Sequence, residues 1–203
     1  MVLRYFIMKK GMWSMTQLSE RDLALLSALI YSEYVVEQKA GASLEDMVEI
    51  LLERTKDGTL GGLTVHGDFG DIKKSQGEAA AAEEFREVLE AIQGSDALKG
   101  LTIQRPLAND GSKSGITAAA FVDASGAATV VFRGTDSYRP WFDNFQATDK
   151  AVTPMQKTAK EYIDGLEYDK ITVTGHSKGG NLAAFVTIVC SKVFLSRKKC
   201  SKN

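Results

Sequence analysis

Residues 170–181 read KITVTGHSKGGN, in which a strand pattern leads into a serine flanked by glycines. Ile171 and Val173 alternate with threonines, and alternating β-branched residues are typical of a strand. The apolar run at 182–186 then indicates a buried helix. A strand, a sharp turn and a helix around Gly-x-Ser-x-Gly form the setting in which a serine nucleophile is exposed. The stretch therefore predicts a nucleophile elbow at Ser177, and a chance occurrence of the pattern is the alternative.

Steric demands explain the two glycines of this pattern. A strained serine backbone lifts the hydroxyl clear of the sheet, and the positions two before and two after it then crowd the neighbouring backbone. These positions are Gly175 and Gly179. The backbone N–H of Lys178, at the start of the helix, is expected to remain available for binding an oxyanion.

Composition and charge limit the functional classes. A chain of 203 residues fits one domain, or one domain with an appendage. The net charge of −1, without a basic stripe outside the last few residues, argues against a nucleic-acid partner. Two cysteines give neither a disulfide framework nor a metal-binding spacing, and we expect no metal and no cofactor. No apolar run approaches the length of a membrane span, so no integral membrane segment is predicted.

Patterning upstream of the elbow divides the chain into regions. We predict a loose N-terminal tail at 1–15, a helical cap region at 16–95, an α/β core at 96–195 and a basic tail at 196–203. Within the cap region, helix starts are predicted at Ser19, Ser43 and Glu78, and the apolar face of the first helix extends to Tyr34.

The core region combines apolar strand patterns with one strongly capped helix. Strand patterns lie at 101–104, 116–122, 127–132 and 170–174, and Thr153-Pro154 opens the helix before the last strand. Strand, helix, strand, helix is a βαβ crossover, which implies parallel strands. We therefore predict an α/β fold with a mostly parallel sheet flanked by helices.

The strand at 127–132 ends in a second informative segment. It runs directly into Arg133-Gly134-Thr135, and a nucleophile elbow takes its second oxyanion donor from such a loop. An ordinary strand-to-helix connection is the alternative. Trp141, Phe142 and Phe145 follow as an aromatic cluster that would line an acyl pocket, form part of a lid or belong to the core.

Together, FRGT at 132–135 and GHSKGGNLA at 175–183 resemble the motifs of the class 3 (fungal-type) lipases. Within that group, the resemblance is to the uncharacterised bacterial lipase-like relatives. The resemblance covers roughly 101–190. It implies a partial α/β-hydrolase fold in a bacterial protein and hydrolysis of a small-molecule or lipid acyl ester, while the cysteine usage favours a reducing, cytoplasmic compartment. By match to the motifs, Ser177 would be the nucleophile, and His176 would support the elbow. The same match makes Thr135, by its backbone N–H and hydroxyl, and Lys178, by its backbone N–H, the oxyanion hole.

The chain departs from this pattern after Ser177. The α/β-hydrolase triad continues with Asp or Glu and then His, but none of these follows among the last 26 residues. Without a base the serine is a poor nucleophile, and His66 would serve only through an unusual arrangement. The sequence thus predicts a weak or inactive serine hydrolase of the lipase or esterase kind, in an apparently C-terminally truncated chain. The alternative is a non-catalytic lipase-like binding or scaffold domain, whose exposed sheet edge would favour self-association.

Overall fold

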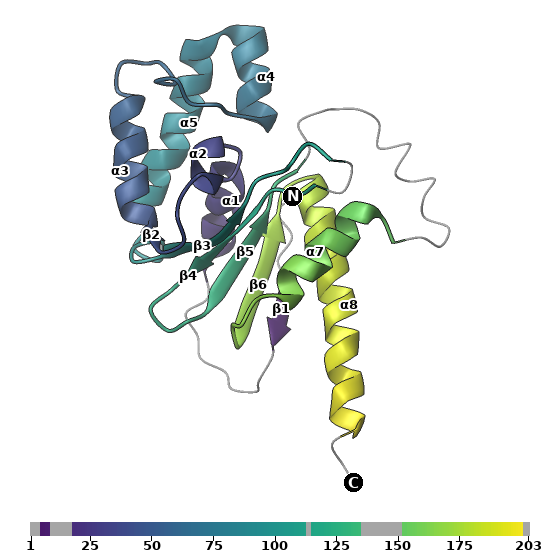
Figure 1. Ribbon diagram of the computed structural model, residues 1–203. Helices are drawn as coiled ribbons and strands as arrows, with labels where there is room; N and C mark the ends of the chain where they lie inside the picture. Colours follow the sequence, from purple (N-terminus) through teal and green to yellow (C-terminus); the bar gives the residue numbers. More distant parts are fainter. Residues whose placement is uncertain (1–4, 9–17, 113–114, 135–151, 201–203) are drawn as a thin grey trace.

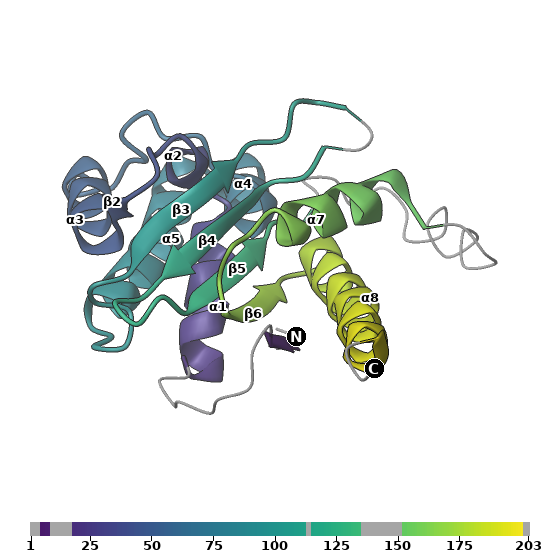
Figure 2. The same cartoon turned by 60° about the horizontal axis from the view of Figure 1, so that its bottom comes forward.

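The computed structural model describes residues 5–8, 18–112, 115–134 and 152–200. These residues form an α/β arrangement, as predicted, in which helices lie on both faces of one sheet (Figures 1 and 2). The strands are β1 (Tyr5–Met8), β2 (Ala42–Ser43), β3 (Thr102–Leu107), β4 (Ala118–Val122), β5 (Ala128–Phe132) and β6 (Lys170–Gly175). The helices are α1 (Glu20–Leu29), α2 (Glu33–Val36), α3 (Leu44–Arg54), α4 (Gly67–Gln76), α5 (Glu78–Gln93), α7 (Pro154–Asp164) and α8 (Lys178–Cys200).

The sheet is mixed, in the order β1-β6-β5-β4-β3-β2. Among the described strands only β5 and β6 pair in parallel, and every other neighbouring pair is antiparallel. The prediction of a mostly parallel sheet is therefore wrong. The reason is visible between β4 and β5, where the Asp123 carboxylate accepts hydrogen bonds from the N–H groups of Ser125 (2.8 Å) and Ala127 (3.0 Å). A turn this short joins only antiparallel strands.

The predicted crossover from β5 through α7 to β6 is confirmed. Val130 of β5 lies opposite Val173 of β6 in the parallel register, and α7 lies between the two strands in the chain. The parallel register brings the ends of both strands, Phe132 and Gly175, to the same edge of the sheet. The segments that follow β5 and β6 therefore start side by side.

Two apolar clusters cover the two faces of the sheet. Phe121 of β4 and Val131 of β5 belong to the cluster formed with the helices from α1 to α5. Val130 and Phe132 of β5 belong to the cluster formed with α7 and α8. All five residues of β4 and all five of β5 are buried, so these central strands contribute to both clusters. Figure 2 shows the two groups of helices on opposite sides of the sheet.

The helix starts follow the sequence signals. The side chains of Ser19, Ser43 and Thr153 each accept a hydrogen bond from the backbone N–H three residues on, which confirms them as N-caps. In α1 and α7 the capping box is complete, because the side chains of Asp22 and Gln156 bond back to the cap N–H.

Three local features differ from expectation. Tyr5–Met8, inside the predicted loose tail, form an edge strand that pairs with β6. Between the predicted helices that start at Ser43 and Glu78 lies a further helix, α4, whose only buried residue, Phe69, gives no periodic signal. The first helix ends at Leu29 instead of reaching Tyr34, because the following backbone turns away and Ser32 forms a β-bridge with Val65.

Candidate functional site

Ser177 lies in the turn between β6 and α8. Its φ is +56°, and Ser177 and Arg105 are the two non-glycine residues in the described part of the chain with positive φ. Left-handed backbone is unfavourable for a residue with a Cβ and persists where the surrounding structure enforces it. Ser177 is also exposed, so the strained turn presents the residue to solvent.

The glycines on either side are required by close backbone contacts. A Cβ on Gly175 would lie 2.6 Å from the carbonyl oxygen of Phe132, at the end of β5. A Cβ on Gly179 would overlap the same oxygen. The predicted strand-turn-helix geometry, with two sterically forced glycines, is therefore confirmed.

The first turn of α8 points backbone N–H groups toward this turn. The N–H of Gly179 donates to the His176 carbonyl (3.0 Å), and that of Asn181 donates to the Ser177 carbonyl (3.3 Å). The Lys178 N–H makes no hydrogen bond to another residue that the structure describes, as expected for the first residue of a helix. Partial burial lowers the pKa of the Lys178 side chain.

The imidazole of His176 meets a residue from the distant N-terminal helices. Its Nδ1 lies 3.4 Å from the Tyr31 hydroxyl oxygen, and the two rings form an edge contact with centroids 6.2 Å apart. Gly134, two residues past β5, lies at the same place. A Cβ there would be 2.5 Å from the Tyr31 hydroxyl and 3.3 Å from Ser177 Cβ. Tyr31 was not predicted as a site residue, because no sequence signal distinguishes it from the apolar residues of the first predicted helix.

His66 forms a separate pair with Glu33. Its Nε2 lies 2.7 Å from Glu33 Oε1, and its backbone N–H donates to the Tyr31 carbonyl (2.9 Å). Within the described ranges, neither histidine of the chain makes a hydrogen bond to Ser177. The structure thus brings together Ser177, His176, Lys178, Gly175 and Gly179, without an imidazole on the hydroxyl.

The remaining predicted site residues lie outside the described residues. These are Thr135 of the oxyanion hole and the aromatic residues Trp141, Phe142 and Phe145. Their roles stay predictions. Within the described part of the chain, no group of His, Cys, Asp or Glu side chains could hold a metal ion, and none of the described helices is long and apolar enough to cross a membrane.

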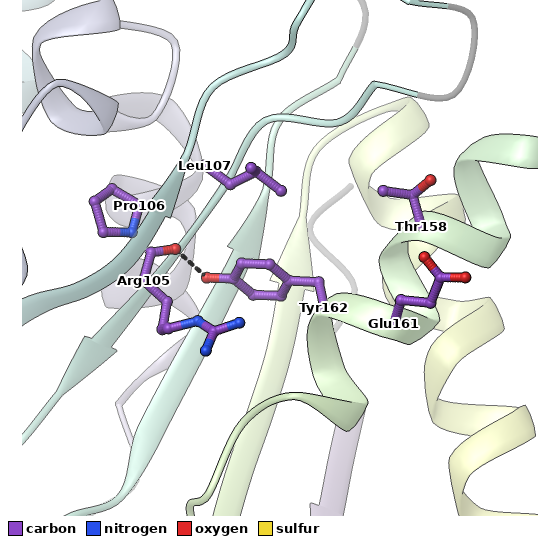
Figure 3. Close-up of a pocket in the computed structure, with 6 residues that line it drawn as sticks. All are labelled: Arg105, Pro106, Leu107, Thr158, Glu161 and Tyr162. Carbon is purple, nitrogen blue, oxygen red and sulfur yellow. Dashed lines mark hydrogen bonds between the residues drawn. The ribbon is translucent and has the colours of Figure 1, made fainter.

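A separate pocket of about 380 Å³ lies between the end of β3 and α7 (Figure 3). The Tyr162 hydroxyl donates to the Arg105 carbonyl (2.7 Å) across it, and burial raises the Tyr162 pKa. Arg105 has a positive φ of 48° at a point where the β3–β4 register shifts. The described lining residues are Arg105, Pro106, Leu107, Thr158, Glu161 and Tyr162, and none of the predicted site residues that the structure describes is among them.

Part of the chain matches a known protein family. Residues 103–197 match the model of a family described as Mbeg1-like, and this segment contains Ser177 and most of the sheet. No curated protein and no solved structure matches the chain. The Mbeg1-like family differs from the class 3 lipases, and no lipase family matches. The prediction that the chain is a class 3 lipase relative is therefore wrong. In residues 103–197 the chain is similar to the Mbeg1-like family.

Proposed function

We propose that the chain is a serine hydrolase that acts on acyl esters, with Ser177 as the nucleophile. The observation that carries this proposal is the exposed, left-handed Ser177 between a buried strand and a helix. A left-handed non-glycine residue costs roughly 1–2 kcal/mol. Such strain is concentrated at functional sites, and an elbow explains both the strain and the two crowded glycines.

In the proposed reaction, the Ser177 oxygen attacks the ester carbonyl and the hydroxyl proton passes to a solvent water molecule. The carbonyl oxygen becomes an oxyanion, and the Lys178 N–H is suited to bind it because it lies at the positive end of α8. Collapse of this intermediate expels the alcohol with a proton and leaves an acyl-enzyme. Water then attacks the acyl-enzyme, the bond to the Ser177 oxygen breaks, the carboxylic acid leaves and the Ser177 hydroxyl is restored.

Slow turnover is part of the proposal. An unassisted serine hydroxyl is a poor nucleophile at neutral pH, and the imidazoles of His66 and His176 contact Glu33 and Tyr31 instead of Ser177. A serine protease site stripped of triad members still gives roughly 10³–10⁴-fold acceleration over water from its remaining parts. We expect activity of this residual kind, best seen on activated esters.

Labelling with a fluorophosphonate probe tests the proposal, because the probe reacts covalently with an activated serine. We expect the wild-type chain to be labelled and Ser177→Ala to lose the label. Ser75→Ala is the matched control, since Ser75 is an exposed serine in the regular helix α4, and its label should persist. Label that survives Ser177→Ala, or a wild-type chain that takes none, would contradict the assignment.

A non-catalytic binding domain of the same shape is the second candidate. The observation that favours it is the commitment of both imidazoles to partners other than Ser177. This candidate predicts no label at Ser177 together with a rise in melting temperature when an acyl ligand is added, since binding to the native state alone stabilises it. A panel of fatty-acid esters of increasing chain length, measured by both assays, separates the two candidates.

A further inference from the structure

We propose that Tyr31 is a positioning residue of the Ser177 site, whose hydroxyl holds the end of β5 against the turn that carries Ser177. The inference rests on the proposed serine hydrolase function and extends it to a residue in the N-terminal helical region. Tyr31 lies 145 positions before His176, between α1 and α2. It is buried, with 6% of its surface exposed.

Backbone contacts fix Tyr31 firmly on the side away from the site. Its carbonyl accepts the hydrogen bond from the His66 N–H (2.9 Å), the next residue forms the β-bridge to Val65, and the Glu33 N–H donates to the Thr64 carbonyl (3.1 Å). The ring then packs against Gly67, where a Cβ would lie 2.5 Å from ring atom Cε1. These contacts hold the backbone and the ring of Tyr31 in place independently of its hydroxyl.

The hydroxyl lies where three segments of the chain converge. The point where a Cβ of Gly134 would stand is 2.5 Å from the Tyr31 hydroxyl oxygen, 3.0 Å from the His176 carbonyl oxygen and 3.3 Å from Ser177 Cβ. Gly134 belongs to the segment after β5, and His176 and Ser177 belong to the turn after β6. The hydroxyl thus lies against both segments that an elbow must keep in register.

Contact with His176 gives the hydroxyl a means of fixing the turn. His176 immediately precedes the strained Ser177, and its Nδ1 lies 3.4 Å from the hydroxyl oxygen. Holding the His176 ring limits rotation of the backbone that leads into Ser177. Displacing a reacting group by about 1 Å can cost about 10²-fold in rate. Loss of this contact should therefore reduce the reactivity of Ser177 more than it weakens the binding of the ester.

The test compares Tyr31→Phe, which keeps the ring and removes the hydroxyl, with Tyr34→Phe as the matched control. Tyr34 lies in α2, partly buried, with the Arg54 guanidinium 4.6 Å above its ring. The readouts are the second-order rate of fluorophosphonate labelling, kcat and KM for p-nitrophenyl butyrate, and urea unfolding. We expect Tyr31→Phe to lower the labelling rate and kcat by about 10-fold or more with KM within about threefold. Tyr34→Phe should leave all three kinetic values unchanged.

A second pair of variants keeps the inference testable if Tyr31→Phe fails to fold. Asparagine places a polar group at the δ position, as the histidine does, whereas leucine cannot hydrogen-bond. We expect His176→Asn to retain at least about ten times the labelling rate of His176→Leu. Combining Tyr31→Phe with His176→Leu should add little further loss, because both changes remove the same contact.

The outcomes distinguish the two proposals. A wild-type chain labelled at Ser177, together with Tyr31→Phe labelled at the wild-type rate, would overturn the role of Tyr31 and leave the hydrolase proposal standing. The role of Tyr31 would also be overturned if the fold-losses in labelling rate from Tyr31→Phe and His176→Leu multiply in the double variant. A wild-type chain without label would contradict the hydrolase proposal itself, and with it the role of Tyr31.

Discussion

Ser177 holds a backbone conformation that a side chain makes costly. Its φ of +56° lies in the left-handed region, which glycine enters freely and other residues enter at a cost. Natural proteins keep such positions where function requires a particular group, and they lose stability for it. The residue at 177 should therefore be suboptimal for stability, whatever its role.

Replacing Ser177 by glycine should stabilise the fold relative to alanine. Both changes remove the hydroxyl, but only glycine relieves the strain, so Ser177→Gly should exceed Ser177→Ala by about 1 kcal/mol in free energy of unfolding, measured in urea. At Ser75, inside α4, the order should reverse, because glycine is about 1 kcal/mol worse than alanine in a helix. Equal stabilities at position 177 would show that the left-handed turn carries no strain.

Only part of this site was predictable from the sequence. The sharp turn at Ser177 and the crowding at Gly175 and Gly179 follow from spacing inside one short stretch, where steric rules apply directly. The contact of Tyr31 with His176 joins positions 145 apart, and no local rule distinguishes Tyr31 from nearby Tyr34. A tertiary contact of this kind needs the fold itself.

At the scale of elements, α1 shows how a helix start is tied to the rest of the molecule. The Asp22 carboxylate accepts hydrogen bonds from the N–H (2.9 Å) and hydroxyl (2.6 Å) of Ser19, and from the Ser95 hydroxyl (2.7 Å) beyond α5. Burial alone would raise the pKa of Asp22, but these hydrogen bonds outweigh it and the pKa is lowered. The carboxylate therefore stabilises the native state when it is charged.

Asp22→Asn should lower the free energy of unfolding by about 2 kcal/mol at neutral pH, because it weakens hydrogen bonds to a buried charge. A carboxyl whose pKa is lowered on folding contributes stability above its unfolded pKa, and that contribution is lost as the pH falls through the folded pKa. The difference between wild type and Asp22→Asn should thus shrink below about pH 4. Asp46→Asn, an exposed first-turn aspartate in α3, is the control. A pH-independent difference would contradict the charge argument.

The sequence predicted elements better than their pairing. Caps and periodicity located α1, α3, α5 and α7, because these signals are local. Strand direction follows from connection length, and the single crossover from β5 to β6 does not make the sheet mostly parallel. The sequence pattern does not predict the helix α4, because this helix buries one side chain, Phe69, and so has no apolar stripe.

At the scale of the whole molecule, the central strands connect the two groups of helices. Because β4 and β5 are buried on both faces, damage to one face should weaken the other. The boundary predicted near residue 95 then separates two regions of sequence that share one core. Self-association through a sheet edge stays a prediction, and the edge strands of the described sheet are β1 and β2.

Phe121→Ala should therefore destabilise the molecule as one unit. Phe121 is fully buried in β4, and its truncation should cost about 3–5 kcal/mol. The helical circular dichroism and the hydrogen-exchange protection of β6 should be lost at the same lowered urea concentration. Ile50→Ala, at an exposed position, should have little effect. Two separate transitions would show that the helical region and the core unfold independently.

The place of β6 between β1 and β5 constrains how the chain reaches this structure. Residues 5–8 pair with residues 170–173, which are translated about 160 positions later. Until then the nascent chain carries one strand without a neighbour and a second, β5, with an open edge. Long-range pairings of this kind slow folding and leave unpaired, aggregation-prone strand edges exposed in the meantime. The same strand that positions Ser177 is therefore expected to form last, so the chain should depend on chaperones until β6 has docked.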